Sequence, residues 1–273
     1  MAPRIISMTP ATMSKYASSS PDVVSWAAKA GYTHVGLRVL TAVADSDHPM
    51  LPGRPMMRET KARLEGEGIT PFEVEVARLD PQTEVAAFAP HLEAASLLGG
   101  KHLVAIGDDL DLPRLTANFA ALCDLAAQFG LTVNLEATSY YVVNSIARAR
   151  AIVDAVAKAN AAVAPDPLHF YRMNDSLDDL HALPHVNVLQ FCDAPAQGSS
   201  IPEERMAEAR QERLPPGEGG LDLRSFVRAL DPGLPVSVEV PMMRALESDG
   251  PVAVAARLLA ATRKVLAEVG SAS

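Results

Sequence analysis

Four apolar segments in the second half of the sequence each end on a side chain that offers an oxygen ligand. These side chains are Glu136, Asp166, Gln190 and Glu239. If the segments are neighbouring parallel strands, their C-terminal ends lie about 5 Å apart along one edge. Three carboxylates and one amide would then converge on one point, although each could instead merely cap a following turn. Carboxylate-rich oxygen sites suit Mg²⁺ or Mn²⁺, so a metal-dependent enzyme is the leading hypothesis.

The segments that must position these residues belong to a regular alternation of strand-like and helical patterns. The predicted strands are Arg4–Met8, Thr33–Leu37, Thr70–Val76, Lys101–Ile106, Leu131–Leu135, Ala161–Ala164, Val186–Phe191 and Val236–Val240. Helical patterns lie between them, and glycines punctuate several of their ends. Eight such units predict a single (β/α)8 TIM barrel over residues 1–273. An open doubly wound sheet is the competing fold, and it is disfavoured because no GxGxxG follows the first strand.

Composition narrows the class of protein further. The chain has 273 residues, 48% of them hydrophobic, and a net charge of −9. The acidic balance argues against a nucleic-acid footprint or an anionic membrane surface. No apolar stretch approaches the roughly 18 residues of a membrane span, and Cys123 and Cys192 indicate buried thiols in a reducing compartment. We therefore expect a cytoplasmic protein whose partner is a small-molecule substrate, and we leave a homo-oligomer open.

The residues at the strand ends carry a resemblance to a known family. Glu136, Asp166 with His169 three residues later, and Glu239 resemble the sugar phosphate isomerase/epimerase superfamily of xylose isomerase-like TIM barrels. The segment from Arg213 to Gly219 is similar to that family's Arg-x-x-x-Gly-x-Gly segment, and the resemblance covers essentially the whole chain. It implies a metal-dependent enzyme of carbohydrate metabolism.

Carried over by position, the resemblance assigns roles to individual residues. Glu136, Asp166, Gln190 and Glu239 would bind a divalent metal, Mn²⁺ or Mg²⁺. Glu136 and Glu239 would also be catalytic, one taking an α-proton and the other returning one, and His169 would contact a substrate oxygen. Arg213 would hold an oxygen or a charge of the substrate.

Gln190 departs from the family pattern, in which this ligand is usually histidine. An amide oxygen can bind a hard cation, but it lowers affinity for softer, Zn-like metals. The Gln190-x-x-Asp193-Ala-Pro setting is instead similar to bacterial 3-dehydroshikimate dehydratases. In those enzymes an arginine at the end of the third strand binds the substrate carboxylate, and Arg78 lies at a comparable place. Glu75 alternates with apolar residues and so faces the barrel interior near the substrate, where Arg38 or Arg78 could pair with it.

Two enzymatic functions share one first step. A divalent metal that chelates a ketone and its neighbouring hydroxyl would stabilise the enediolate formed when the α-proton leaves. Reprotonation gives an isomerase or epimerase acting on a small sugar, polyol or keto-acid, which is the preferred function. Loss of a β-hydroxyl, with His169 as the acid, gives a lyase acting on a cyclic hydroxyketone such as 3-dehydroshikimate. A barrel endonuclease is disfavoured because it needs more histidines at strand ends, and a non-catalytic binding barrel is the remaining alternative.

Overall fold

Eight parallel strands run through the middle of the computed structural model, which describes residues 4–13, 20–40 and 48–270. The strands are β1 Ile6–Met8, β2 His34–Arg38, β3 Thr70–Leu79, β4 His102–Gly107, β5 Thr132–Glu136, β6 Ala161–Ala164, β7 Leu189–Phe191 and β8 Val236–Val238. They pair in the order β6-β5-β4-β3-β2-β1-β8-β7. The gap between β6 and β7 is bridged by backbone hydrogen bonds from Gln190 to Pro165 (3.0 Å) and from Val163 to His185 (3.2 Å). The sheet is therefore a nearly closed barrel, which confirms the predicted fold class.

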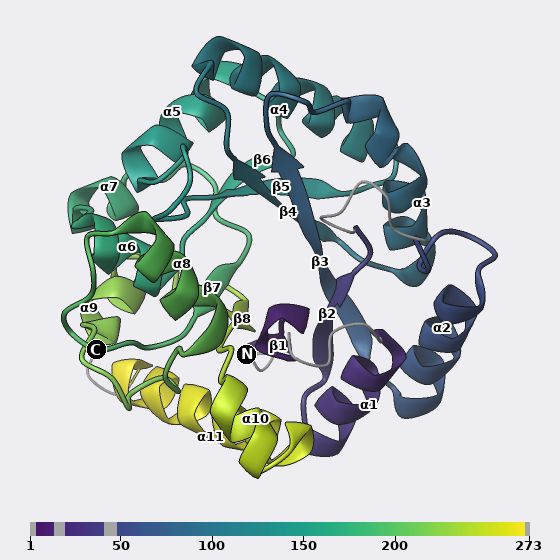
Figure 1. Ribbon diagram of the computed structural model, residues 1–273, viewed down its shortest axis with the longest axis vertical. Helices are drawn as coiled ribbons and strands as arrows, with labels where there is room; N and C mark the ends of the chain where they lie inside the picture. Colours follow the sequence, from purple (N-terminus) through teal and green to yellow (C-terminus); the bar gives the residue numbers. More distant parts are fainter. Residues whose placement is uncertain (1–3, 14–19, 41–47, 271–273) are drawn as a thin grey trace.

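Helices cover the outside of the barrel on all sides (Figure 1). Those between the first six strands are α1 Ser20–Ala30, α2 Pro55–Glu67, α3 Ala89–Leu98, α4 Leu112–Ala127 and α5 Ile146–Val156. Those after β6 are α6 Pro167–Met173, α7 Leu177–His181, α8 Pro202–Gln211, α9 Leu223–Arg228, α10 Met243–Ser248 and α11 Pro251–Gly270. Short 3₁₀ turns occupy Pro10–Met13 and Val85–Phe88. In the described ranges, no helix combines the length and apolarity needed to cross a membrane.

The strands are buried on both faces, and their sequences show it. In β4, β5 and β6 almost every residue is buried, as expected for parallel strands with helices outside and side chains inside. The main core packs strand residues such as Leu103 and Val133 against helix residues such as Phe119. This packing holds the C-terminal strand ends in fixed positions, and catalytic groups of TIM barrels sit at those ends.

One prediction about strand length needs correction. The predicted strands Val186–Phe191 and Val236–Val240 are shorter in the structure, at Leu189–Phe191 and Val236–Val238. Glu239 consequently lies just beyond β8, where its side chain is free to turn toward the neighbouring strand ends. Its backbone N–H still donates to the carbonyl of Phe191 at 3.1 Å, so the position is fixed by β7.

Candidate active site

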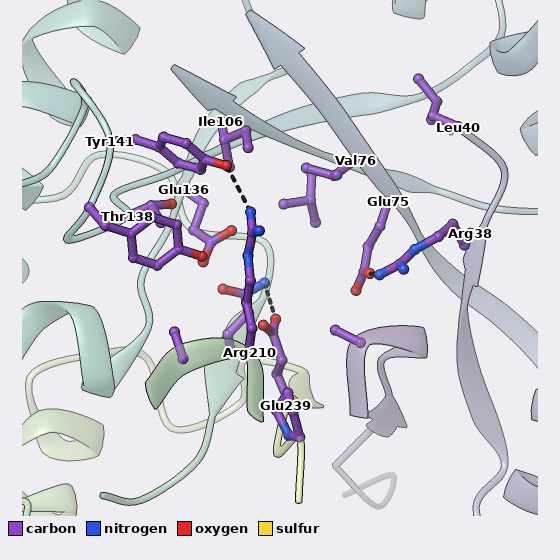
Figure 2. A pocket seen from close by; sticks show the side chains of 16 residues that line it. Arg38, Leu40, Glu75, Val76, Ile106, Glu136, Thr138, Tyr141, Arg210 and Glu239 are labelled. Atoms are coloured by element: carbon purple, nitrogen blue, oxygen red, sulfur yellow. Dashed lines mark hydrogen bonds and ion pairs between the residues drawn. The ribbon is translucent and has the colours of Figure 1, made fainter. Parts of the chain in front are cut away.

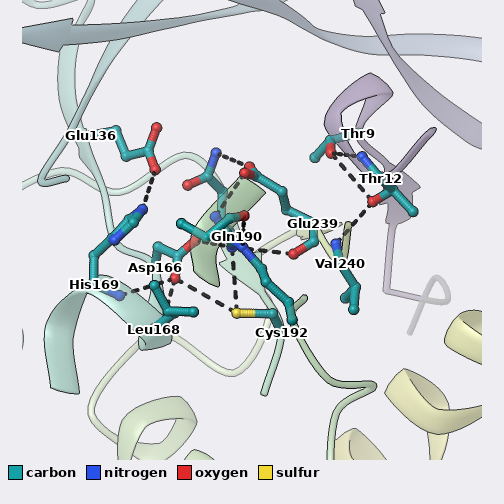
Figure 3. Close-up of polar contacts among 12 residues, drawn as sticks. Thr9, Thr12, Glu136, Asp166, Leu168, His169, Gln190, Cys192, Glu239 and Val240 are labelled. Carbon is teal, nitrogen blue, oxygen red and sulfur yellow. Dashed lines mark hydrogen bonds and ion pairs between the residues drawn. The ribbon is translucent and has the colours of Figure 1, made fainter. Parts of the chain in front are cut away.

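The four predicted strand-end residues gather at one end of the barrel (Figure 3). Glu136 is the last residue of β5, Asp166 follows β6, Gln190 is in β7, and Glu239 follows β8. Glu136, Asp166 and Gln190 are buried, whereas the side chain of Glu239 is 13% exposed. Gln190 Nε2 donates to Glu239 Oε2 at 3.0 Å. Parallel strands thus bring together residues that are far apart in the sequence.

Arg213 forms ion pairs with two of these carboxylates. Its Nη1 donates to Asp166 Oδ2 at 2.7 Å, and its Nη2 donates to Glu239 Oε1 at 2.8 Å. Nε donates to the carbonyl of Ala209 at 2.8 Å, so the last turn of α8 fixes the guanidinium. The residue is 2% exposed. The structure therefore places Arg213 where it orients Asp166 and Glu239, and it does not line the cavity described below.

Contacts with Asp193 explain the glycines in the loop that follows Arg213. The backbone N–H groups of Gly217 and Gly219 both donate to Asp193 Oδ2 at 3.0 Å. Gly217 has a φ of +84°, and a Cβ on Gly219 would lie 2.3 Å from Asp193 Oδ1. Glycine is required at both positions, because one needs a left-handed backbone and the other needs close approach. Asp193 thus caps the loop.

His169 lies beside Glu136 in the first turn of α6. Its Nδ1 is 3.0 Å from the hydroxyl of Ser139, and its Nε2 is 3.5 Å from Glu136 Oε1. Asp166 is the N-cap of the same helix and accepts from the backbone N–H of Leu168 at 2.7 Å. Ligand atoms of Glu136, Asp166 and His169 lie within 4.8 Å of one another. This spacing is short enough for three groups to share one metal ion.

Burial and neighbouring charge set the protonation of these groups. Burial raises the pKa of Glu136 well above its usual range, and the charges of Glu239 and Asp166 add to the effect. Burial also raises the pKa of Asp166, but the charge of Arg213, acting together with the hydrogen bonds from Arg213 and the backbone N–H of Leu168, brings that pKa below its usual value. Burial lowers the pKa of His169 to about 4, which keeps the imidazole neutral. Glu239 shows a raised pKa because of burial, with Arg213 opposing the shift.

A divalent cation fits this set of donors. Gln190 Oε1 and His169 Nε2 are buried and accept or donate no hydrogen bond among the described residues. Burial and the neighbouring carboxylates raise the pKa of Glu136, and a bound cation would lower it by supplying positive charge. Carboxylate and amide oxygens are ligands for hard cations, and a neutral imidazole nitrogen can also bind a metal. His169 is therefore available as a ligand as well as for the predicted contact with substrate.

A cavity of 470 Å³ opens onto the strand ends (Figure 2). Glu136, Gln190 and Glu239 line it, together with apolar residues of β3 and β4 such as Val76 and Ile106. The space accommodates a small organic substrate, and the apolar wall would exclude water from part of it. Two of the predicted catalytic groups, Glu136 and Glu239, thus face the same space.

The two other predicted substrate-binding residues lie differently with respect to this cavity. Glu75 lines it, and its Oε2 is 3.4 Å from Nη2 of Arg38, one of the two partners expected from the sequence. Arg78 is not among the lining residues. Its guanidinium pairs with Asp108 and lies 5.2 Å from the ring centre of Tyr141. The expected contact of Arg78 with a substrate carboxylate therefore stays a prediction without a direct path in this structure.

Several contributors were not predicted from the sequence. Thr12 donates from Oγ1 to the carbonyl of Val238 and accepts from the N–H of Val240, both at 2.9 Å, so it holds the backbone around Glu239. Arg210 of α8 lines the cavity beside Tyr140. Neither Thr12 nor Arg210 belongs to a motif, and only the close spacing of Arg210 and Arg213 could have drawn attention to α8.

Comparisons with known proteins agree with this architecture. A family model described as a xylose isomerase-like TIM barrel matches residues 24–264. No curated protein matches the sequence. A crystal structure of the IolI protein with a bound zinc atom superposes with a TM-score of 0.76 at 18% identity, covering 97% of this chain and 99% of that one.

Two further structures give the same result. A xylose isomerase domain protein from Alicyclobacillus acidocaldarius has a TM-score of 0.74 at 18% identity, with 97% and 99% of the two chains covered. D-allulose 3-epimerase from Methylomonas sp. in complex with D-allulose has a TM-score of 0.68 at 17% identity, with 96% and 97% covered. At these identities the likeness establishes the fold.

Proposed function

Because this chain belongs to the xylose isomerase-like TIM barrel family, we propose that it is a divalent-metal-dependent isomerase or epimerase acting on a small hydroxyketone. The observation that carries the proposal is the convergence of Glu136, Asp166, Gln190 and Glu239 at the edge of one cavity. Solved structures of similar fold include sugar 3-epimerases, one of them holding D-allulose. These proteins support the class of reaction, and the residues of this chain support the chemistry.

The side chains divide the work as follows. Glu136 and Glu239 both line the cavity, so one can take the proton next to the substrate carbonyl and the other can return one. Glu239 receives hydrogen bonds from Arg213 and Gln190, which fix the direction of its carboxylate. A divalent cation held by Glu136, Asp166, Glu239 and Gln190 would supply Lewis-acid stabilisation of the charge that develops on the substrate oxygens. The oxygen-rich donor set favours Mn²⁺ or Mg²⁺.

The dehydratase alternative is less well supported. It depended on Gln190 and on Arg78 as the binder of a substrate carboxylate. Arg78 is paired with Asp108 and is not among the residues that line the cavity. We therefore retain isomerisation or epimerisation as the proposed reaction.

Exchange of the substrate's α-proton with solvent deuterium tests the proposal. The protein is incubated in D₂O with Mn²⁺ or Mg²⁺ and a panel of ketoses and keto-acids, and NMR follows both exchange and product. We expect metal-dependent exchange that is lost with EDTA and in Glu239→Gln. A matched control is Glu93→Gln, an exposed carboxylate on α3, which should leave exchange unchanged. Exchange that persists in EDTA, or in Glu239→Gln, would refute the assignment.

A further inference from the structure

The charges around the cavity are balanced except at one residue. Arg38 pairs with Glu75, and Arg78 pairs with Asp108. Glu136, Asp166 and Glu239 together are offset by Arg213 and one divalent cation, a count that rests on the proposed function. Arg210 lines the same cavity, and no carboxylate oxygen of the described residues lies within 4.0 Å of its guanidinium. One positive charge on the cavity wall is therefore left over.

Arg210 is held in place by aromatic side chains (Figure 2). Its guanidinium carbon lies 5.6 Å from the centre of the Tyr140 ring, and its Nη2 donates to the hydroxyl of Tyr141 at 2.8 Å. Contacts of this kind fix the position of a guanidinium without neutralising it. A binding group that is already ordered loses less entropy when its ligand arrives. The arrangement is that of a preformed anion site.

We propose that Arg210 and Tyr141 bind a carboxylate of the substrate, so that the enzyme acts on a hydroxyketone acid in preference to a neutral ketose. A guanidinium binds a carboxylate through two parallel N–H groups, and the phenol adds a third donor. A single guanidinium balances the one negative charge of a carboxylate, whereas a phosphate dianion would leave excess charge here. Both residues lie on the cavity wall, so the acid group would be bound at one part of it and the reacting carbons would remain beside Glu136 and Glu239.

The test uses two ligands that cannot isomerise and that differ in one group. Methyl α-D-glucopyranosiduronate carries a carboxylate where methyl α-D-glucopyranoside carries a hydroxymethyl group. Calorimetry measures the binding of each to the Mn²⁺-loaded protein and to the metal-free protein. We expect the uronide to bind about tenfold or more tightly in both forms, as a charge-assisted contact predicts.

Three variants assign the preference to its source. Arg210→Met should abolish it while keeping the apolar stem of the side chain. Tyr141→Phe should reduce it several-fold, and Arg224→Met, which removes an exposed arginine of α9, should leave it intact. Equal binding of the two ligands by the wild type, including binding of neither, would overturn the proposal. A preference that survives Arg210→Met and disappears without Mn²⁺ would also overturn it, because the metal would then be the anion site.

These outcomes are separable from those of the proposed function. A uronide preference that depends on Arg210 in the metal-free protein, found with no α-proton exchange, would refute the isomerase and leave the carboxylate site standing. Exchange on neutral ketoses with no uronide preference would do the reverse.

Discussion

Three carboxylates at the strand ends and one other buried carboxyl group, that of Glu73, lie within the same barrel. They differ in the groups that lie next to them. Glu136, Asp166 and Glu239, here called the ring carboxylates, lie at the C-terminal strand ends, where Arg213 pairs with two of them. Glu73 belongs to β3, and its carboxyl group accepts a hydrogen bond from the hydroxyl of Ser237 in β8. Because β2 and β1 separate these two strands in the sheet, the contact crosses the barrel interior.

The pKa alone does not separate the two groups, because burial raises it well above its usual value for Glu136 as well as for Glu73. The charge of Glu75 raises the pKa of Glu73 further, and both effects favour the protonated form of Glu73. The ring carboxylates have a guanidinium, an amide and a cavity within reach. Buried acids alone therefore do not identify a functional site. The neighbouring guanidinium and the adjoining cavity are what distinguish the ring carboxylates from Glu73.

The largest expected difference between the ring carboxylates and Glu73 is in catalytic turnover. Glu239→Gln should lower turnover by about 10²–10⁴-fold, because it removes a proton-transfer group that is also a predicted metal ligand. Glu73→Gln should leave turnover within a few-fold of the wild type, because a neutral amide replaces a neutral acid. Rates of α-proton exchange on a confirmed substrate measure both effects. Equal losses in the two variants would show that the two groups are not distinct.

Replacing Arg213, the guanidinium that pairs with two ring carboxylates, should lower the free energy of unfolding. Arg213→Met leaves Asp166 and Glu239 buried without their partner, and breaking such a pair costs about 3–5 kcal/mol in the free energy of unfolding. Urea titration measures the change. Arg257→Met, which removes an exposed arginine from α11, should change it by less than about 0.5 kcal/mol. A neutral effect of Arg213→Met would mean that the ring does not depend on this guanidinium.

The raised pKa of Glu73 should make the free energy of unfolding depend on pH. The folded-state pKa of Glu73 is raised above the unfolded value of 4.5, so its stabilising contribution is complete below pH 4.5 and declines as pH rises toward the folded pKa. Relative to Glu73→Gln, the wild type should lose up to about 1.4 kcal/mol per pH unit within that window. Melting temperatures of both proteins between pH 5 and pH 9 measure it. A constant difference across this range would contradict a protonated Glu73.

The smallest effect concerns the amide of the ring. Gln190→His replaces an oxygen donor by an imidazole, which suits softer metals. We expect the ratio of Zn²⁺ to Mg²⁺ affinity to rise by about tenfold, or 1.4 kcal/mol. Competition between the two ions, followed by calorimetry, tests this. An unchanged ratio would remove Gln190 from the set of metal ligands.

The sequence allowed the barrel and the ring to be predicted because both depend on local signals. Alternating strand and helix patterns predict the fold, and Glu136, Asp166, Gln190 and Glu239 each follow or end an apolar segment. Asp166 followed by Pro167 is also a common start of a helix, and Asp166 does cap α6. One residue therefore combines the role of helix cap with that of a predicted metal ligand.

Other features could not be predicted because they depend on which strands face each other across the barrel. Nothing near Arg213 in the sequence shows that its guanidinium reaches Asp166, which lies 47 residues earlier. The contact of Glu73 with Ser237 spans 164 residues and passes through the barrel interior. The same holds for Thr12, whose hydroxyl supports β8 from the far end of the chain.

Equilibrium titration with Mn²⁺ tests most directly whether the ring carboxylates and not Glu73 form the metal site. Electron paramagnetic resonance of free Mn²⁺ gives the number of sites and the affinity for the wild type, Glu136→Gln and Glu73→Gln. We predict one Mn²⁺ per chain, an affinity at least about tenfold lower in Glu136→Gln, and an unchanged affinity in Glu73→Gln. Binding that Glu136→Gln leaves intact, or that Glu73→Gln abolishes, would contradict the account.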